Sequence, residues 1–198
     1  MNDDEGARDD SPDVAGPTDA AAEPGEPIDL DADQAADAAA LQDFWEAARM
    51  RTGITRTAVV TGMSAEATLP PPSWSFGDNP ELADRLLDLV LAGTKTATAT
   101  SLAELEQAGE PVPGRGDLSI VLDGAGHPRA LICTTDVRVV AFRDVTEEQA
   151  AAEGADDRSL ASWRREHSTY FRRVLAGAGA EFSEDLPVAI ETFELLYP

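Results

Sequence analysis

Residues 93–101, Gly-Thr-Lys-Thr-Ala-Thr-Ala-Thr-Ser, constrain the fold of this chain more than any other stretch. Before them, residues 81–91 carry leucines at helical spacing, which predicts an amphipathic helix that begins after Asn79-Pro80 and ends at Gly93. After Gly93, threonines alternate with alanines, a pattern that is typical of a strand. The chain is therefore expected to leave a helix, turn tightly and place Lys95, its only lysine, at the start of a strand.

Acidic residues are concentrated at the beginning of the chain. The 198 residues include 38 Asp and Glu against 15 Lys and Arg, a net charge of −23, and the first 40 residues carry thirteen acids beside one arginine. Residues 1–30 have almost nothing to bury, so we expect a disordered acidic tail. An acidic surface opposes binding to long duplex DNA, which depends on basic groups. A small nucleoside, or a short single-stranded segment that enters one local basic pocket, is compatible with this charge.

Features of secreted, membrane-spanning and metal-binding proteins are missing from the sequence. The N-terminus has no basic region followed by an apolar core, and no apolar run approaches the roughly 20 residues of a membrane span. Cys133 is the only cysteine and is interpreted as a small core residue. His127 falls in a turn and His167 on an apolar helix face, where a core histidine is more common than a ligand or a base. We expect a cytoplasmic protein without a metal or another cofactor.

Helices and strands are interleaved along the rest of the chain. Residues 31–72 are expected to form a helix that carries Phe44 and Trp45 and packs on the main domain, followed by an irregular linker. Within residues 73–198 the patterns predict strands at 118–122 and 188–197, and one long or two short strands over 129–142. They also predict short helices at 102–107 and 146–152 and a long helix at 159–175. Mixed strands with helices at their edges indicate an α+β fold, with the sheet curled into a small barrel.

Three segments, in this order, resemble the ASCH domain family. They are Gly93-x-Lys95-Thr96-x-Thr98, the turn that ends in Gly116-Asp117 before a strand, and Glu153-Gly-x-Asp156-x-Arg158-Ser-Leu-x-x-Trp163-Arg164. The resemblance covers residues 73–198, and the Trp45 helix is similar to an N-terminal extension in one bacterial branch of the family. It implies a PUA-like β-barrel flanked by helices, with a cleft for RNA or modified nucleosides beside the barrel.

The resemblance also implies an activity. Some small bacterial ASCH proteins are amidohydrolases that deacylate N4-acetylcytidine with a lysine, a threonine and a glutamate, which correspond to Lys95, Thr98 and Glu153 in this chain. Some members carry an arginine two residues beyond that threonine, where this chain has Thr100, so the choice of substrate is open. The sequence leaves two functions side by side: an amidohydrolase acting on an N4-acylcytidine, and a non-catalytic module that binds RNA or a modified nucleoside. A nuclease fits an acidic chain least well.

The chemistry of an amidohydrolase suits these three residue types. Thr98 would attack the amide carbonyl, a desolvated Lys95 would take its proton, and a protonated Glu153 would protonate the leaving amine. Residues 95 and 98 point to opposite faces of a regular strand, so they converge only if Lys95 lies in the preceding turn or a bulge intervenes. The alternatives are an ordinary strand threonine at 98 and a buried ion pair of Lys95 with Glu153 or Asp117.

Further residues are expected to bind the substrate. Arg164, Arg165 and Arg172 form the only basic patch predicted in the chain, either as contacts for RNA phosphates or as a solvated helix face. The predicted binding set is Thr96, Asp156, Arg158, Trp163, Arg164, Arg165 and Arg172.

Overall fold

The computed structural model describes residues 30–54, 69–177 and 179–198. Its elements are, in order, α1 (Leu30–Thr52), β1 (Ser73–Trp74), α3 (Pro80–Leu91), β2 (Ala97–Ser101), α4 (Leu102–Ala108), β3 (Leu118–Leu122), β4 (Pro128–Ala141), the 3-10 helix η2 (Phe142–Asp144), α5 (Glu147–Ala152), α6 (Leu160–Gly177) and β5 (Pro187–Tyr197). Except for Leu30, the predicted acidic tail lies outside the described residues, as does most of the predicted linker.

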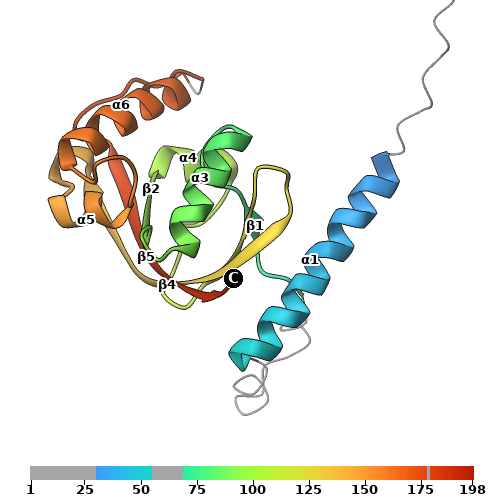
Figure 1. Ribbon diagram of the computed structural model, residues 1–198. Helices are drawn as coiled ribbons and strands as arrows, with labels where there is room; N and C mark the ends of the chain where they lie inside the picture. Colours follow the sequence, from blue (N-terminus) through green and yellow to red (C-terminus); the bar gives the residue numbers. More distant parts are fainter. Residues whose placement is uncertain (1–29, 55–68, 178) are drawn as a thin grey trace, which may run out of the picture.

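The strands form one sheet in the order β1-β3-β4-β5-β2, with β1 parallel to β3 and the other pairs antiparallel. The predicted α+β class is confirmed, and the long strands β4 and β5 curve around α3 (Figure 1). The predicted closed barrel is wrong: the sheet remains open, with β1 and β2 as its two edges in the described part of the chain. A barrel needs a continuous ladder between its end strands, and β1 has only two residues with which to form one.

Three apolar clusters hold the helices on the sheet. Helix α3 packs Leu87 and Val90 against residues of β3, β4 and β5, and α6 packs Phe171 and Leu175 against another region that includes β5. Trp45 of α1 is only 3% exposed and packs against buried residues of β3 and β4, which confirms that this helix is attached to the main domain. The described residues contain no helix with the length and apolar character needed to cross a membrane.

The turn between α3 and β2 forms as the sequence predicts. Gly93 takes a φ of +69°, which glycine adopts without steric cost, and the carbonyl of Leu89 accepts hydrogen bonds from the main-chain N–H groups of Thr94 and Lys95. Strand β2 begins only at Ala97. Lys95 therefore lies in the turn before the strand, free of the alternation that a strand imposes on its side chains.

Candidate functional site

Lys95 and Glu153 form a buried ion pair. Nζ of Lys95 lies 3.2 Å from Oε2 of Glu153 and donates a hydrogen bond to the carbonyl of Ala97 at 2.8 Å. Only 2% of the lysine side chain and 7% of the glutamate side chain are exposed. The ring of Phe76 covers the ammonium group, with its centroid 4.9 Å from Nζ. Of the two partners that the sequence left open for Lys95, the structure selects Glu153.

The main chain brings these two residues together. Glu153 follows α5, whose start is fixed by a capping box between Thr146 and Gln149. At the other end of α5, the N–H of Thr96 donates to the carbonyl of Ala152 at 2.8 Å. The turn after α3 is thereby attached directly to the residue before Glu153.

Gly154 allows this close approach. Its φ is +74°, and a Cβ at this position would lie 2.8 Å from the carbonyl oxygen of Thr94. Any larger residue would push α5 away from the turn that carries Lys95. The Glu153-Gly154 pair of the third sequence segment therefore has a steric basis.

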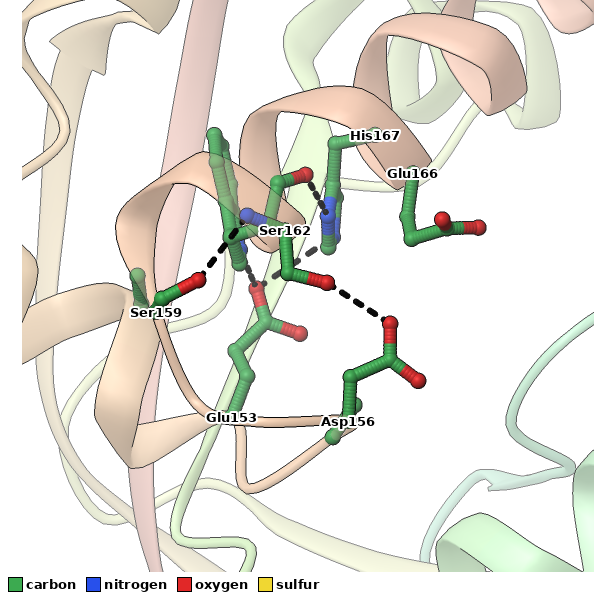
Figure 2. Close-up of a pocket in the computed structure, with 9 residues that line it drawn as sticks. Glu153, Asp156, Ser159, Ser162, Glu166 and His167 are labelled. Atoms are coloured by element: carbon green, nitrogen blue, oxygen red, sulfur yellow. Dashed lines mark hydrogen bonds and ion pairs between the residues drawn. The ribbon is translucent and has the colours of Figure 1, made fainter.

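The second carboxylate oxygen of Glu153 is held from α6. The indole Nε1–H of Trp163 donates to Oε1 at 2.6 Å, and Nε2 of His167 lies 3.3 Å from the same oxygen (Figure 2). The rings of Trp163 and His167 stack, with centroids 4.1 Å apart and planes 16° apart. Sequence reasoning assigned no function to His167, and its one available signal was the four-residue spacing from Trp163 that places both rings on one helix face.

Glu153 is an ionised group in this site. Burial raises its pKa, but the charge of Lys95, the charge of His167 and hydrogen bonds from His167 and Trp163 together lower the pKa to about 2. The sequence predicted a protonated Glu153 that acts as a general acid. The surrounding donors instead stabilise the carboxylate, because each of them points at an oxygen of Glu153 that must accept.

Thr98 lies on β2 directly opposite Glu191 of β5. Residues directly opposite on antiparallel strands have their side chains on the same face, so Thr98 and Glu191 share one face of the sheet. Among the described residues, no hydrogen bond joins the Thr98 side chain to Lys95 or Glu153. The structure thus brings together two members of the predicted catalytic trio and leaves the third on the adjoining strand.

Glu191 is itself unusual. It is buried, and one of its carboxylate oxygens accepts a hydrogen bond from the hydroxyl of Thr134. Burial and the nearby charge of Asp117 raise its pKa, and the hydrogen bond from Thr134 opposes them only in part. Glu191 is not recognisable from the sequence as a site residue, because a lone glutamate in an apolar strand has no local signature.

Four of the residues predicted to bind the substrate instead contact other groups of the protein. Asp156 accepts from the hydroxyl of Ser162 at 2.7 Å, and Arg158 donates to the carbonyl of Ala151 at 3.0 Å. Thr96 donates its hydroxyl to the carbonyl of Ala152. Trp163 is buried against Phe142 and His167, so its ring holds Glu153 and offers no open stacking surface.

The three arginines of the predicted basic patch also contact other groups of the protein. Arg164 donates to the carbonyl of Arg143 at 2.6 Å, and the guanidinium of Arg172 lies 4.7 Å from the ring centroid of Phe182. Arg165 contacts the hydroxyl of Ser162 and two carboxylates, those of Asp156 and Glu166. These contacts favour a helix face paired with other protein groups over a phosphate-binding patch, although Nε of Arg164 is buried without a hydrogen-bond partner.

The described residues enclose two hollows, of which one is lined by a member of the ion pair. The first, of about 30 Å³, has room for one water molecule and is lined by Glu153, Asp156, Ser162, His167 and their neighbours on α5 and α6 (Figure 2). The second is an open hollow of about 350 Å³ between the Ser75–Pro80 segment and Gly124. Phe76 lines the second hollow and its ring also covers Lys95, but neither Lys95 nor Glu153 lines that hollow. The described residues contain no cluster of three or more His, Cys, Asp or Glu able to hold a metal ion.

The fold and the site together define an α+β domain with a PUA-like sheet and a lysine–glutamate pair buried at the end of a threonine-rich strand. The sequence profile of the ASCH domain matches residues 72–197, and the chain belongs to this family. The crystal structure of protein EF3133 from Enterococcus faecalis is similar, with 31% identity over 80% of this chain and 88% of that one and a TM-score of 0.65.

The crystal structure of an ASCH domain from Lactobacillus crispatus is also similar. It has 30% identity over 75% of this chain and 96% of that one, with a TM-score of 0.62. A comparison with proteins of curated function found no significant match.

Proposed function

We propose that this ASCH protein is an amidohydrolase that deacylates N4-acylcytidine or a similar acylated nucleoside. The observation that carries the proposal is the buried pair of Lys95 and Glu153, the only lysine of the chain held against a carboxylate beside the strand that bears Thr98. Buried ionisable groups held against a specific charge partner are enriched at functional sites.

In the proposed reaction, Thr98 is the nucleophile and Lys95 moves the proton. Neutral Lys95 takes the hydroxyl proton as Thr98 Oγ bonds to the acyl carbon, and the resulting ammonium is stabilised by Glu153. Lys95 then gives that proton to the cytosine N4 as the carbon–nitrogen bond breaks. Water hydrolyses the acyl-threonine in the second half, with Lys95 taking its proton and returning it to Thr98.

The size and charge of the surroundings favour a free nucleoside over a long RNA. The open hollow of about 350 Å³ is close to the lower limit for pockets that hold small ligands. The arginines at 164, 165 and 172 are engaged with protein groups, and the chain has a net charge of −23.

The second candidate is a non-catalytic module that binds a modified nucleoside. The observation in its favour is the ionised state of Glu153, whose pKa of about 2 matches a permanent ion pair with Lys95. In such a module, Lys95 and Glu153 would present fixed charges to the ligand and undergo no proton transfer.

Incubation with N4-acetylcytidine, followed by chromatography of cytidine and acetate, separates the two candidates. An amidohydrolase turns the substrate over, and Lys95→Met and Thr98→Val each lower the rate by about a hundredfold or more. Thr100→Val, on the same strand two residues away, is the matched control and retains the rate. Binding without product supports the module, and neither binding nor product contradicts both.

The Glu153→Gln variant tests how the carboxylate contributes. An ionised Glu153 stabilises the ammonium form of Lys95, so its loss should lower turnover while substrate affinity changes only a few-fold. Turnover near the wild-type rate in a well-folded Glu153→Gln protein would remove Glu153 from the catalytic set.

A further inference from the structure

Glu191 is a buried acid to which the fold gives no counter-ion. The residue is 8% exposed, and its carboxyl group receives one hydrogen bond among the described residues, from the hydroxyl of Thr134 to Oε1. Burial raises its pKa, and so does the charge of Asp117, which has the same sign. A neutral side chain at this position would stabilise the fold more, so the carboxyl group has no structural reason to be here.

The other oxygen of Glu191, Oε2, is still open. It has no hydrogen bond within the described part of the chain, yet it is not sealed inside the protein. The described side-chain atoms that are both fully enclosed and without a hydrogen-bond partner are Nε1 of Trp45 and Nε of Arg164. Oε2 is not one of them, so it keeps contact with solvent. A ligand that carries a hydrogen-bond donor can therefore reach it.

The register of the sheet places this open oxygen beside Thr98. Thr98 is directly opposite Glu191, and side chains paired in this way are separated by about 5 Å at their Cβ atoms. Two positions along the same face, Ala189 of β5 is opposite Val139 of β4, and Val139 is 50% exposed. The face that bears Thr98 and Glu191 thus opens to solvent on this side.

The base of the proposed substrate has a donor that fits Oε2. In the proposed reaction, the acyl carbon that bonds to Oγ of Thr98 is also bonded to the exocyclic N4 of cytosine, so N4 comes next to Glu191. N4 carries one hydrogen in an N4-acylcytidine and two in cytidine. A carboxylate that accepts from this nitrogen is a common way for proteins to recognise cytosine. Uracil has an oxygen at the same place, and two acceptors would face each other.

We propose that Glu191 is a specificity-determining residue whose free carboxylate oxygen accepts a hydrogen bond from N4 of a cytosine base. This inference rests on the proposed function, which places the base beside Thr98. The ligand then supplies the partner that the protein withholds from this buried group. Thr134 holds the carboxyl group in place through its other oxygen, and Glu191 takes no part in proton transfer.

The test compares binding of cytidine, the product of the proposed reaction, with binding of uridine. Calorimetric titration of the full chain at pH 8 gives the ratio of the two dissociation constants in wild type and in two variants. Glu191→Met has a similar length and no acceptor, and Glu191→Gln has an amide that can turn to suit either base. Glu194→Gln, at an exposed position of the same strand, is the matched control.

Wild type and Glu194→Gln should bind cytidine about tenfold or more tightly than uridine, and the ratio should approach one in both Glu191 variants. A general loss of structure would weaken both nucleosides alike, so the ratio separates recognition from folding. The proposal is overturned by a wild type that binds neither nucleoside or binds both equally, and by a folded Glu191→Met protein that keeps the wild-type ratio.

The proposed function is judged separately, because this measurement needs no turnover. A wild type that prefers cytidine through Glu191 but leaves N4-acetylcytidine intact rejects the amidohydrolase and supports the role of Glu191. A wild type that deacylates N4-acetylcytidine without preferring cytidine over uridine keeps the amidohydrolase and rejects the role of Glu191.

Discussion

Lys95 Nζ and Glu153 Oε2, 58 positions apart in the sequence, meet at 3.2 Å where the turn after α3 touches the end of α5. This pair joins two segments that no sheet hydrogen bonds connect, and it does so beneath the ring of Phe76. Its two charges depend on each other, because each group is the nearest counter-ion of the other and both are buried.

Removing one partner of the pair should therefore destabilise the fold more than removing both partners. Lys95→Met leaves the Glu153 carboxylate without its nearest cation and should lower the free energy of unfolding by roughly 3 kcal/mol or more. The double variant Lys95→Met/Glu153→Gln should recover most of this loss. Urea denaturation at pH 7 measures both, and a double variant whose loss equals the sum of the single losses would contradict the coupling.

Protonation of Glu153 at low pH should destabilise the folded protein. Burial raises its pKa, but Lys95 and His167 lower the pKa to about 2, below the ordinary value of 4.5. The carboxylate therefore stabilises the fold fully above pH 4.5, and this contribution is lost as the pH falls towards 2. Between pH 5 and pH 2 the wild type should lose roughly 3 kcal/mol of unfolding free energy that Glu153→Gln does not lose. Exposed Glu148→Gln, the control, should follow the wild type.

Glu191 should show the opposite dependence on pH. Burial and Asp117 raise its pKa above the ordinary value of 4.5, so its ionised form is disfavoured in the folded protein. Stability should fall as the pH rises from 4.5 through the raised pKa. Glu191→Gln, which can still accept the hydrogen bond from Thr134, should be more stable than wild type at pH 7 and lose this advantage near pH 4. Exposed Glu194→Gln, on the same strand, should show no such crossover.

Two glycines provide a matched test of the turn. Gly93→Ala places a Cβ in open space at a φ of +69° and should cost about 1 kcal/mol from the backbone conformation alone. Gly154→Ala has a similar φ, but its Cβ would lie 2.8 Å from the Thr94 carbonyl oxygen. It should cost clearly more and should also lower turnover, because α5 must move Glu153 away from Lys95. Equal melting temperatures for the two variants would show that the clash is relieved without cost.

The attachment of α1 should be measurable at one position. Trp45→Ala removes a buried ring from the cluster with Ile120 and Leu131, and should cost roughly 3 kcal/mol or more. Met50 lies on the same helix and is 73% exposed, so Met50→Ala should change the free energy of unfolding very little. Thermal and urea denaturation of both variants would show whether α1 is part of the cooperative unit.

The helix, turn and strand around Lys95 were predictable because their signals are local. The proline at the start of α3, the glycine in the left-handed conformation and the alternating threonines each act within a few residues. The capping box between Thr146 and Gln149, at the start of the helix before Glu153, is a local signal in the same sense.

Local sequence signals could not decide whether the sheet closes into a barrel, or whether the arginines on α6 are free to bind phosphate. Closure depends on the length and pairing of β1, a two-residue strand that no period-two pattern marks. The spacing of Arg164 and Arg172 places them on α6, but their partners, the Arg143 carbonyl and the Phe182 ring, come from other segments.

The sequence by itself determined the α+β class, the ASCH family and the position of Lys95 in a turn before a strand, because these depend on short-range steric preferences and on segments read in order. The tertiary structure alone decided that Lys95 pairs with Glu153 and not with Asp117, that Glu153 is a carboxylate, and that His167 and Glu191 belong to its surroundings. The charge state of a buried group depends on which distant donors reach its oxygens, and the packing of α5, α6 and the sheet determines that.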